Sequence, residues 1–423
     1  MNYRVRVLIL LFLLSIITYI DRVCISVAGP RMQQDLSITP ERWGWVVGAF
    51  TLSYALFEIP SGAMADKLGA RSVLTRIVLW WSIFTSLTGA VSNFGLLLLA
   101  RFCFGAGEAG AYPGSASAVS RWFPAPERAR ATGAFWMASR LGGAVSPLLV
   151  VPIQQAYGWR MSFFVFGILG VIWCGVWYWW YRDHPTLKEG ITRRELDEIG
   201  CGSPKPHHSL PWGEAMRHPN FWRLLAMYHT YCWGSYFYLS WLHTYLQKGR
   251  GFTENEMKIF STLPFLVGAC GNLFGGFLSD HLIKRYGLKF GRRAVGATGL
   301  ALSGCFMFAT SQTSSKELAV LFLALGYGAM DCMLPVAWAV CLDIGGKYAG
   351  AVSGSMNMAG QLGSFLTSIV FGYVVAATNN NYNAPLLHMS AMLLISAFLF
   401  TRIDPTKPLI RDAGDSSTLA KAA

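Results

Sequence analysis

The sequence predicts an all-α membrane protein of twelve transmembrane helices, arranged as two parallel six-helix pseudo-repeats. Composition, apolar segments and internal repetition indicate this. Of the 423 residues, 53% are hydrophobic and only 13% are charged, whereas about a quarter of an average soluble domain is charged. The mean hydropathy is +0.38. This composition is typical of a polytopic membrane protein and excludes a disordered or ordinary cytosolic one.

Twelve apolar stretches divide the chain, each close to the ~20 residues that a spanning helix needs. The first six lie near residues 7–29, 43–64, 73–91, 95–119, 129–153 and 160–181, and the second six near 221–247, 257–281, 292–311, 317–342, 348–376 and 385–402. We therefore expect an N-terminal six-helix bundle at 1–181, a cytoplasmic linker at 182–219, a C-terminal six-helix bundle at 220–404 and a cytoplasmic tail at 405–423.

The two halves resemble each other. Gly62-Ala-Met-Ala-Asp66 recurs as Gly276-Phe-Leu-Ser-Asp280, and each segment closes the second apolar stretch of its half. Gly133-Ala-Phe-Trp-Met-Ala-Ser-Arg140-Leu-Gly142 aligns with Gly354-Ser-Met-Asn-Met-Ala-Gly-Gln361-Leu-Gly363. Both matches start from the same side of the membrane, so the repeats are predicted to be parallel. Parallel halves of this kind place a substrate site between them.

Lysine and arginine predict the orientation. With the N-terminus inside, the inner loops and tails carry most of the 35 cationic residues, which favours cytoplasmic termini. We therefore expect a multi-pass membrane protein with both termini in the cytoplasm. An alternative is a cleaved signal peptide, because Arg4, Arg6 and an apolar run precede Ser26-Val27-Ala28. The repeat argues against cleavage, since it needs six helices in each half.

Soluble and catalytic functions find little support in the sequence. The nine cysteines are scattered and fit small buried hydrophobes rather than a disulfide framework or a metal site. We find no nucleophile with a base, no metal cluster and no phosphate loop, so we expect neither an enzyme nor a cofactor. The net charge of +13 is assigned to topology rather than to nucleic acid. The expected partners are a small organic anion and membrane lipid, without an obligate protein partner.

Ionisable residues inside the apolar stretches mark a pathway, because charge at bilayer depth is costly. Arg22 is suited to bind a carboxylate with its planar fork; the alternative is an ion pair with Asp21 or Glu108 that only orders the bundle. Arg101, Gly105, Glu108 and Tyr112 are spaced to share one helix face. A carboxyl at low dielectric can exchange a proton near neutral pH, so Glu108 is the candidate carrier. Arg101 either holds the anion or tunes the carboxyls.

Further polar residues complete the candidate site. With Arg22, Arg140 could clamp a second carboxylate; pairing with Glu58 is the alternative. Tyr54 can donate to hydroxyl groups, and Glu58, one turn later, is expected in a gate or an ion pair.

In the second half, Asn357 and Gln361 offer the donors and acceptors that a polyol needs, although they could also bond between helices. Trp338 is a candidate cavity residue. Asp331 is either a further proton or ion site or a locally paired acid.

One loop resembles a family signature. Gly62-x-x-x-Asp66-Lys67-x-Gly69-x-Arg71 is similar to the signature loop of the major facilitator superfamily. Such a loop suits a gate, because its charged groups can pair with helix ends in one conformation and release them in another. Asp66, Lys67 and Arg71 are therefore gating candidates, together with Asp280 of the second half and Glu58.

Within that superfamily, three segments resemble the anion:cation symporter family, which includes bacterial hexuronate, galactonate and glucarate transporters, sialin and the vesicular glutamate transporters. They are Tyr19-Ile-Asp21-Arg22-Val-Cys-Ile-Ser-Val-Ala, Arg101-Phe-Cys-Phe-Gly105-Ala-Gly107-Glu108-Ala and Tyr112-Pro113. The resemblance implies co-transport of an organic anion with protons or sodium, and a place in the bacterial cytoplasmic membrane. It ties Asp21, Arg22, Arg101 and Glu108 to substrate and proton. Cys24, Glu58 and Arg140 depart from the family pattern.

We therefore expect a proton-coupled symporter that imports an organic anion by alternating access, with a sugar acid (hexonate, hexuronate or aldarate) as the leading substrate class. Asp21 and Glu108 are the expected proton-coupling residues, and Arg22, Tyr54, Arg101, Arg140, Asn357, Gln361 and Trp338 the expected substrate-binding ones. Sodium coupling stays open. The alternatives are an organic-anion exchanger, a transporter of aromatic acids or dicarboxylates, and a transporter-like nutrient sensor.

Overall fold

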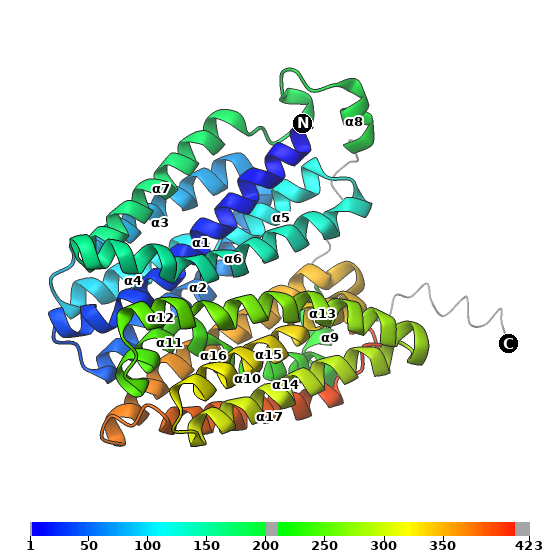
Figure 1. The fold of residues 1–423 in the computed structure, drawn as a ribbon. Coiled ribbons are helices and arrows are strands. Elements are labelled where there is room, and N and C mark those ends of the chain that lie inside the picture. Colours follow the sequence, from blue (N-terminus) through cyan, green and yellow to red (C-terminus); the bar gives the residue numbers. More distant parts are fainter. Residues whose placement is uncertain (1, 200–209, 411–423) are drawn as a thin grey trace.

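The computed structural model describes residues 2–199 and 210–410, except for the side chains of residues 59, 62, 63, 65–67, 125, 126, 129 and 347. The described chain is almost entirely helical (Figure 1). The first half contains α1 (Tyr3–Asp35), α2 (Pro40–Leu68), α3 (Ala70–Ala90), α4 (Phe94–Glu108), α5 (Ala111–Trp122), α6 (Ala125–Tyr157) and α7 (Trp159–Trp180).

The second half begins after three short helices, η1 (Pro185–Leu187), α8 (Arg193–Ile199) and α9 (Trp212–Ala215). It contains α10 (Pro219–Ser240), α11 (Leu242–Thr244), a π-helical turn (Tyr245–Gly249), α12 (Glu254–Phe260), α13 (Thr262–Tyr286), α14 (Leu288–Gln312), α15 (Lys316–Gly345), the 3₁₀ turn η3 (Gly346–Tyr348), α16 (Ala349–Ala377) and α17 (Ala384–Arg402).

All twelve predicted spans correspond to helices, with α4–α5 and α12–α13 each forming one interrupted span. Within the described residues, ten segments are long and apolar enough to cross a membrane. The remaining two are α2 and α10, which are 29 and 22 residues long. Both carry polar side chains that line a central cavity, such as Glu58 in α2 and Tyr231 in α10.

Glycine turns repeat between the halves. Gly69 joins α2 to α3 with φ +83°, and Gly287 joins α13 to α14 with φ +85°. Positive φ strains any residue that carries a Cβ atom, so glycine is favoured at both turns. The two turns occupy corresponding places after the second span of each half, which is the local counterpart of the sequence repeat.

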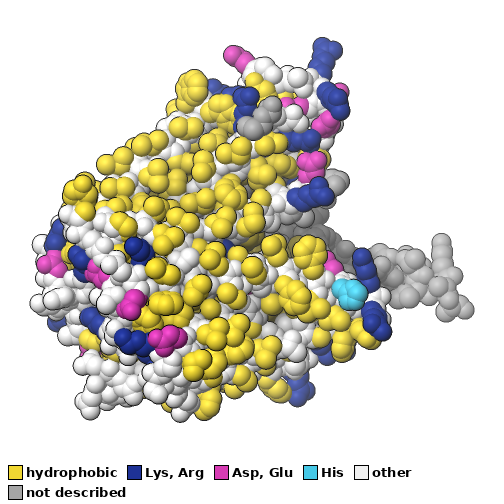
Figure 2. Space-filling view, viewed as in Figure 1, with side chains coloured by type: hydrophobic (Ala, Val, Ile, Leu, Met, Phe, Trp, Pro, Cys, Tyr) yellow, Lys and Arg dark blue, Asp and Glu magenta, His cyan; other side chains and the backbone are white. Residues whose placement is uncertain are grey.

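A band of apolar side chains covers the middle of the surface (Figure 2). Large hydrophobic side chains are exposed there, including Ile168 of α7 and Phe274 of α13, while charged groups gather towards the two ends of the helices. Exposed apolar area of this extent marks a surface that faces lipid rather than water. The fold is therefore that of a multi-pass membrane protein.

The two halves pack closely at the end of the molecule where α1 ends, which we call the distal end. There α16 lies directly against α2: a Cβ atom on Gly44 would lie 2.6 Å from the Ser368 carbonyl oxygen, and one on Gly372 would lie 2.3 Å from that of Pro40. Small residues thus let the two backbones approach. We call the opposite end, where α1 begins and α8 lies (Figure 1), the proximal end.

The short helix α8 is docked on the first half at the proximal end. The Arg4 backbone N–H donates to Glu195 at 2.9 Å, and the Arg4 guanidinium bonds Glu198 at 2.8 Å and Glu127 of α6 at 3.2 Å. The Thr192 hydroxyl accepts a hydrogen bond from the Glu195 N–H at 3.3 Å, which caps the start of α8. The segment between the halves therefore contains a short helix fixed by charge.

Candidate functional site

A cavity of about 110 Å³ lies between the two halves, near the middle of the helices. Both halves contribute aromatic and polar side chains to its wall. The first half provides Tyr19, Arg22, Tyr54, Glu58, Tyr112, Trp136 and Arg140, and the second provides Tyr228, Tyr231, Cys232, Ser235, Tyr236, Leu239, Tyr327, Leu334, Trp338, Asn357, Gln361 and Ser364. A concave site with few charged groups among many aromatic ones is typical of small-molecule binding.

Arg22 and Glu108 form a buried ion pair at this cavity. Arg22 Nε donates to Glu108 Oε1, and Glu108 is completely buried. Within the described part of the chain, Arg22 Nη2 and Glu108 Oε2 have no hydrogen-bond partner. The pair therefore keeps one unused donor and one unused acceptor in a buried place.

Aromatic rings surround the Arg22 guanidinium. Its carbon lies 4.9 Å from the ring centre of Tyr54, 5.2 Å from Phe50, 5.5 Å from Tyr19 and 5.7 Å from Tyr112. A guanidinium is attracted to the faces of such rings and is weakly hydrated. The rings hold the arginine in place while leaving its fork available to an anion.

Gly105 lets α4 bring Glu108 to this position. A Cβ atom on Gly105 would lie 2.3 Å from both the Phe50 carbonyl oxygen and Ser53 Oγ. Only glycine allows this approach of α2 to α4 without displacing backbone. Because Tyr54 follows on α2, the contact sets the acid and the tyrosine on either side of Arg22.

Arg101 and Asp21 lie beside this site but do not line the cavity. Arg101 is buried, with its guanidinium carbon 5.1 Å from the ring centre of Phe50 and 4.6 Å from that of Phe104. Asp21 is 1% exposed, and neither carboxyl oxygen has a partner among the residues described. Arg101 was expected to bind substrate; the structure places it behind the cavity wall.

Arg140 forms a second buried ion pair, this one between the halves. Its Nη2 donates to Asp331 Oδ1 at 2.9 Å, and its Nη1 donates to the Tyr327 hydroxyl at 2.5 Å. Asp331 is completely buried, and its Oδ2 has no partner within the described ranges. The structure thus joins two residues that the sequence left separate, and Glu58 is not the partner of Arg140.

Glu58 instead accepts a hydrogen bond from the side-chain amide of Asn357 at 2.5 Å, which links α2 to α16. Glu58 Oε2 has no partner among the described residues. Gln361 lies one turn further along α16 and lines the same cavity. The polar groups expected for gating and for substrate hydroxyls are therefore in contact across the two halves.

The gating candidates of the signature loop lie elsewhere. The side chains of Asp66 and Lys67 are outside the described residues. Arg71 donates to the Tyr178 carbonyl oxygen at 2.8 and 2.9 Å, so it is tied to α7 of its own half. In the second half, Asp280 lies 3.8 Å from Arg292, which also bonds Asp343 at 3.0 Å.

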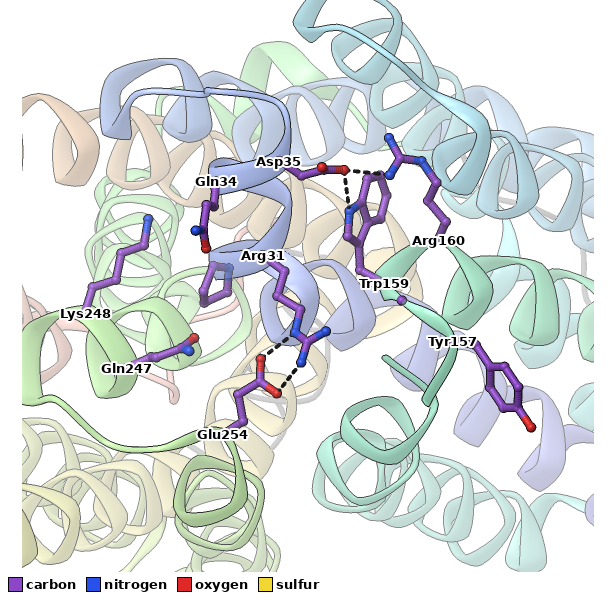
Figure 3. A pocket seen from close by; sticks show the side chains of 11 residues that line it. Arg31, Gln34, Asp35, Tyr157, Trp159, Arg160, Gln247, Lys248 and Glu254 are labelled. Carbon is purple, nitrogen blue, oxygen red and sulfur yellow. Dashed lines mark hydrogen bonds and ion pairs between the residues drawn. The ribbon is translucent and has the colours of Figure 1, made fainter. Parts of the chain in front are cut away.

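A different ion pair joins the halves at the distal end, and the sequence analysis missed it. Arg31 donates to Glu254 through Nε at 2.5 Å and through Nη2 at 2.7 Å (Figure 3). Its Nη1 donates to the Gln154 carbonyl oxygen at 2.8 Å. The pair lies in the wall of a hollow of about 980 Å³. Charged residues are common at the ends of spans, so the sequence offered no signal for this pairing.

Aromatic cavity residues were also under-predicted. Tyr112 stacks on Trp136 with 4.8 Å between ring centres, and Trp136 lies 5.7 Å from Trp338. Among the described residues, the Tyr112 hydroxyl and Trp338 Nε1 have no hydrogen-bond partner. Tyr112 could have been found, because it continues the stripe of Arg101 and Glu108. Trp338 was predicted as a cavity residue and lies in the cavity wall, whereas Trp136 is hidden among the 14% of aromatic residues.

Two helical bundles around a central, charged and aromatic cavity define a membrane transporter of the two-bundle class. Residues 11–368 match the Major Facilitator Superfamily, and the chain belongs to that family. It is therefore a multi-pass transporter and not an enzyme.

Relatives carry small organic acids according to their names. The chain is 35% identical to the probable sulfoacetate transporter of Cupriavidus necator over 398 residues, which cover 93% of this chain and 92% of the relative. It is 29% identical to the probable galactarate/D-glucarate transporter of Escherichia coli over 426 residues, which cover 94% of this chain and 93% of the relative. It is also 29% identical to an E. coli D-galactonate transporter over 413 residues, or 94% of each.

The fold is shared with a solved structure. A bacterial homologue of the human lysosomal transporter Spinster, in an inward-facing and unoccupied conformation, matches with a TM-score of 0.78 and 21% identity. The match covers 96% of this chain and 97% of that chain. This similarity supports the arrangement of the helices alone.

Proposed function

We propose that the chain is a proton-coupled symporter that imports a small organic acid across the bacterial cytoplasmic membrane. The observation that carries the proposal is the buried pair of Arg22, which lines the cavity, and Glu108 behind it, which together keep one unused donor and one unused acceptor. An unpartnered buried polar group is costly. A carboxylate on Arg22 and a proton on Glu108 would together remove that cost.

Competition for the Arg22 guanidinium couples binding of the anion to protonation of Glu108. While Glu108 is ionised, it occupies Arg22 Nε and repels a second anion at the same fork. Removing Arg22 from an ionised and fully buried Glu108 would cost about 3–5 kcal/mol. Protonation of Glu108 removes its charge and releases the arginine to the substrate. Anion and proton therefore bind together, which is the requirement for symport.

Neighbouring groups serve the rest of the substrate. Tyr54, Gln361 and Trp338 line the cavity and can bond hydroxyl or carboxyl oxygens. Asn357 can join them once its amide leaves Glu58. Asp21, buried without a partner among the described residues, shares the coupling proton with Glu108 in the proposal, so that the two carboxyls together carry one proton. Arg101 acts on these carboxyls through its charge rather than by touching the substrate.

The leading substrate class is a sugar acid, and the cavity of about 110 Å³ suits a small ligand. The relatives support this class, since they include transporters named for galactonate, galactarate and glucarate, and one named for the smaller sulfoacetate. Proton coupling is proposed from the Arg22–Glu108 geometry, and no cofactor takes part.

The orientation follows from the positive-inside rule. We place the proximal end, with both termini, in the cytoplasm and the distal end outside. Arg31 and Glu254 then close the outer side of the cavity in this conformation. Import requires this contact to open, substrate and proton to enter, and the halves to rock about the central site.

Uptake into proteoliposomes tests the proposal. Purified protein is reconstituted and given labelled D-galactonate, D-glucarate or sulfoacetate, with and without an inwardly directed proton gradient. We expect accumulation above the outside concentration of at least one anion, only when the gradient is present. Equal uptake with and without the gradient would contradict symport. Accumulation that instead follows an inward sodium gradient would show that sodium, and not the proton, is the coupling ion.

A further inference from the structure

We propose that Arg140 and Tyr327 form a second anion subsite in the same cavity, and that the substrate is a small organic dianion. Its first acidic group binds Arg22 and its second replaces Asp331 on Arg140. This inference deepens the proposed function and rests on it. It adds a substrate class and a second protonated acid.

The geometry of the second pair carries the argument. Arg140 reaches from α6 of the first half to α15 of the second, where it bonds both Tyr327 and Asp331. Arg140 and Tyr327 line the cavity, whereas Asp331 lies behind them and is completely buried. The guanidinium therefore stands between the cavity and the acid. An anion that enters the cavity meets the arginine first.

Space for this cluster is made by Gly268 of α13. A Cβ atom there would lie 2.5 Å from the ring of Tyr327 and 3.0 Å from Asp331 Oδ2. The glycine allows tyrosine and aspartate to pack against α13 without a clash, and Asp331 Oδ2 keeps no partner within the described residues. Arg140, Tyr327 and Asp331 thus form a pre-organised polar cluster in which Asp331 Oδ2 is an unused acceptor.

The two arginines are matched in their surroundings. Arg22 is 9% exposed and Arg140 is 6% exposed, and the acid on each is 0% exposed. Each acid uses one oxygen for its arginine and leaves the other without a partner among the described residues. An arginine cannot lose its proton in a protein. Both forks therefore stay cationic, whatever the state of the two acids.

The balance of charge in the site then sets how many protons move with each anion. A monoanion displaces Glu108 alone and leaves the Arg140–Asp331 pair intact. A dianion that binds both arginines leaves two buried carboxyls without a counter-charge, and burial disfavours that state unless both take a proton. One dianion should therefore move with two protons, so that no net charge crosses the membrane.

Within the described part of the chain, few other titratable groups surround Asp331. Tyr231 and Tyr238 of α10 lie near it, and Tyr327 and Cys332 are on its own helix. The helix α6 presents Arg140 and α13 presents Gly268. Tyrosine and cysteine are neutral in their ordinary state at neutral pH. Among the described residues, Arg140 is thus the cation that neutralises the charge of Asp331. When a ligand takes Arg140 away from this pair, Asp331 itself must take up a proton.

Matched probes test the substrate class on the full-length chain in proteoliposomes. The pairs are D-glucarate with D-gluconate and sulfoacetate with acetate, in which the second member lacks the second acidic group. We expect the unmodified protein to prefer one dianion over its partner by at least tenfold in kcat/KM. Equal kcat/KM for both members of both pairs, with gradient-driven accumulation intact, would overturn the second subsite but not the proposed symport. Absence of gradient-driven uptake of all four probes would overturn both.

Variants test the residues. Arg140→Gln should lower the ratio of dianion to monoanion kcat/KM at least tenfold, and Tyr327→Phe, which removes only a hydroxyl, should lower it about threefold. The exposed Arg194→Gln is the matched arginine control and should leave the ratio unchanged. A ratio unaffected by both Arg140→Gln and Tyr327→Phe would contradict the proposal.

Asp331→Asn should reduce the protons moved per dianion from two to one, so that uptake becomes sensitive to membrane potential. A stoichiometry equal to that of the unmodified protein would contradict the assignment of Asp331 as the second protonated acid.

Discussion

Arg31 of α1 and Glu254 of α12 hold the distal ends of the two halves together through two parallel hydrogen bonds of 2.5 and 2.7 Å. Arg31 also bonds the Gln154 carbonyl oxygen at the end of α6. In the proposed cycle the outer side must open to admit substrate, so this contact has to break once in each turnover. It is therefore the natural place to shift the balance between the two conformations.

Glu254→Gln should favour the conformation that is open at the distal end. A partly exposed ion pair contributes up to about 1 kcal/mol, which corresponds to roughly a fivefold change in population. The readout is labelling of a cysteine introduced at Ser26, which is buried at the distal contact with Ser240 and His243, by a reagent that cannot cross the membrane. Labelling should be about fivefold faster in Glu254→Gln. Asp35→Asn, which breaks a pair with Arg160 inside one half, is the control, and an equal increase there would contradict the gate assignment.

Gly105→Ala should damage both stability and transport. The added Cβ atom would lie 2.3 Å from the backbone of Phe50, and overpacking of this kind costs about 1–3 kcal/mol. We expect a lower thermal unfolding temperature in detergent and weaker substrate binding, because α4 carries Glu108 away from Arg22. Gly133→Ala is the matched control, since a Cβ atom there meets nothing within 4 Å. An unfolding temperature equal to that of the control would show that α2 and α4 do not need the close approach.

Asn357→Asp tests the contact between α2 and α16. The substitution places a second carboxyl against Glu58, whose oxygen now accepts from the Asn357 amide at 2.5 Å. Like charges at that separation repel strongly in a buried place. We expect the maximal uptake rate at pH 7.5 to fall at least tenfold, and to recover in part at pH 5.5, where the two carboxyls can share a proton. Asn357→Ala, which adds no charge, should have a smaller effect without the recovery; identical pH profiles for the two variants would contradict this role.

The fold could be predicted from sequence because it depends on local signals. The apolar length of each span is set by bilayer thickness, and the turns at Gly69 and Gly287 repeat with the halves. Arg22 and Glu108 could be singled out because charge at that depth is costly. These inferences need a composition, a spacing or a single residue type, and each of those is visible along the chain.

The pairings could not be predicted, because helical spacing constrains only residues on the same helix. Arg140 meets Asp331 across 191 positions of sequence, and Arg31 meets Glu254 across 223. Arg101 shares the helix face of Glu108, yet it packs on Phe104 behind the cavity wall. Residue spacing places Arg101 and Glu108 on one face of a helix, but how that face lies relative to the cavity depends on how α2 packs against α4.

Glu108→Gln tests the central claim most directly, because glutamine keeps the shape of the side chain but carries neither the charge nor the proton. Two assays are run on the same proteoliposomes: exchange of labelled for unlabelled substrate without a gradient, and accumulation driven by a proton gradient. With the monoanion D-galactonate as substrate, we predict that exchange persists, since Arg22 is freed from its buried competitor, while gradient-driven accumulation falls to background. Accumulation at the level of the unmodified protein would contradict the assignment of Glu108 as the proton carrier, and with it the coupling proposed at Arg22.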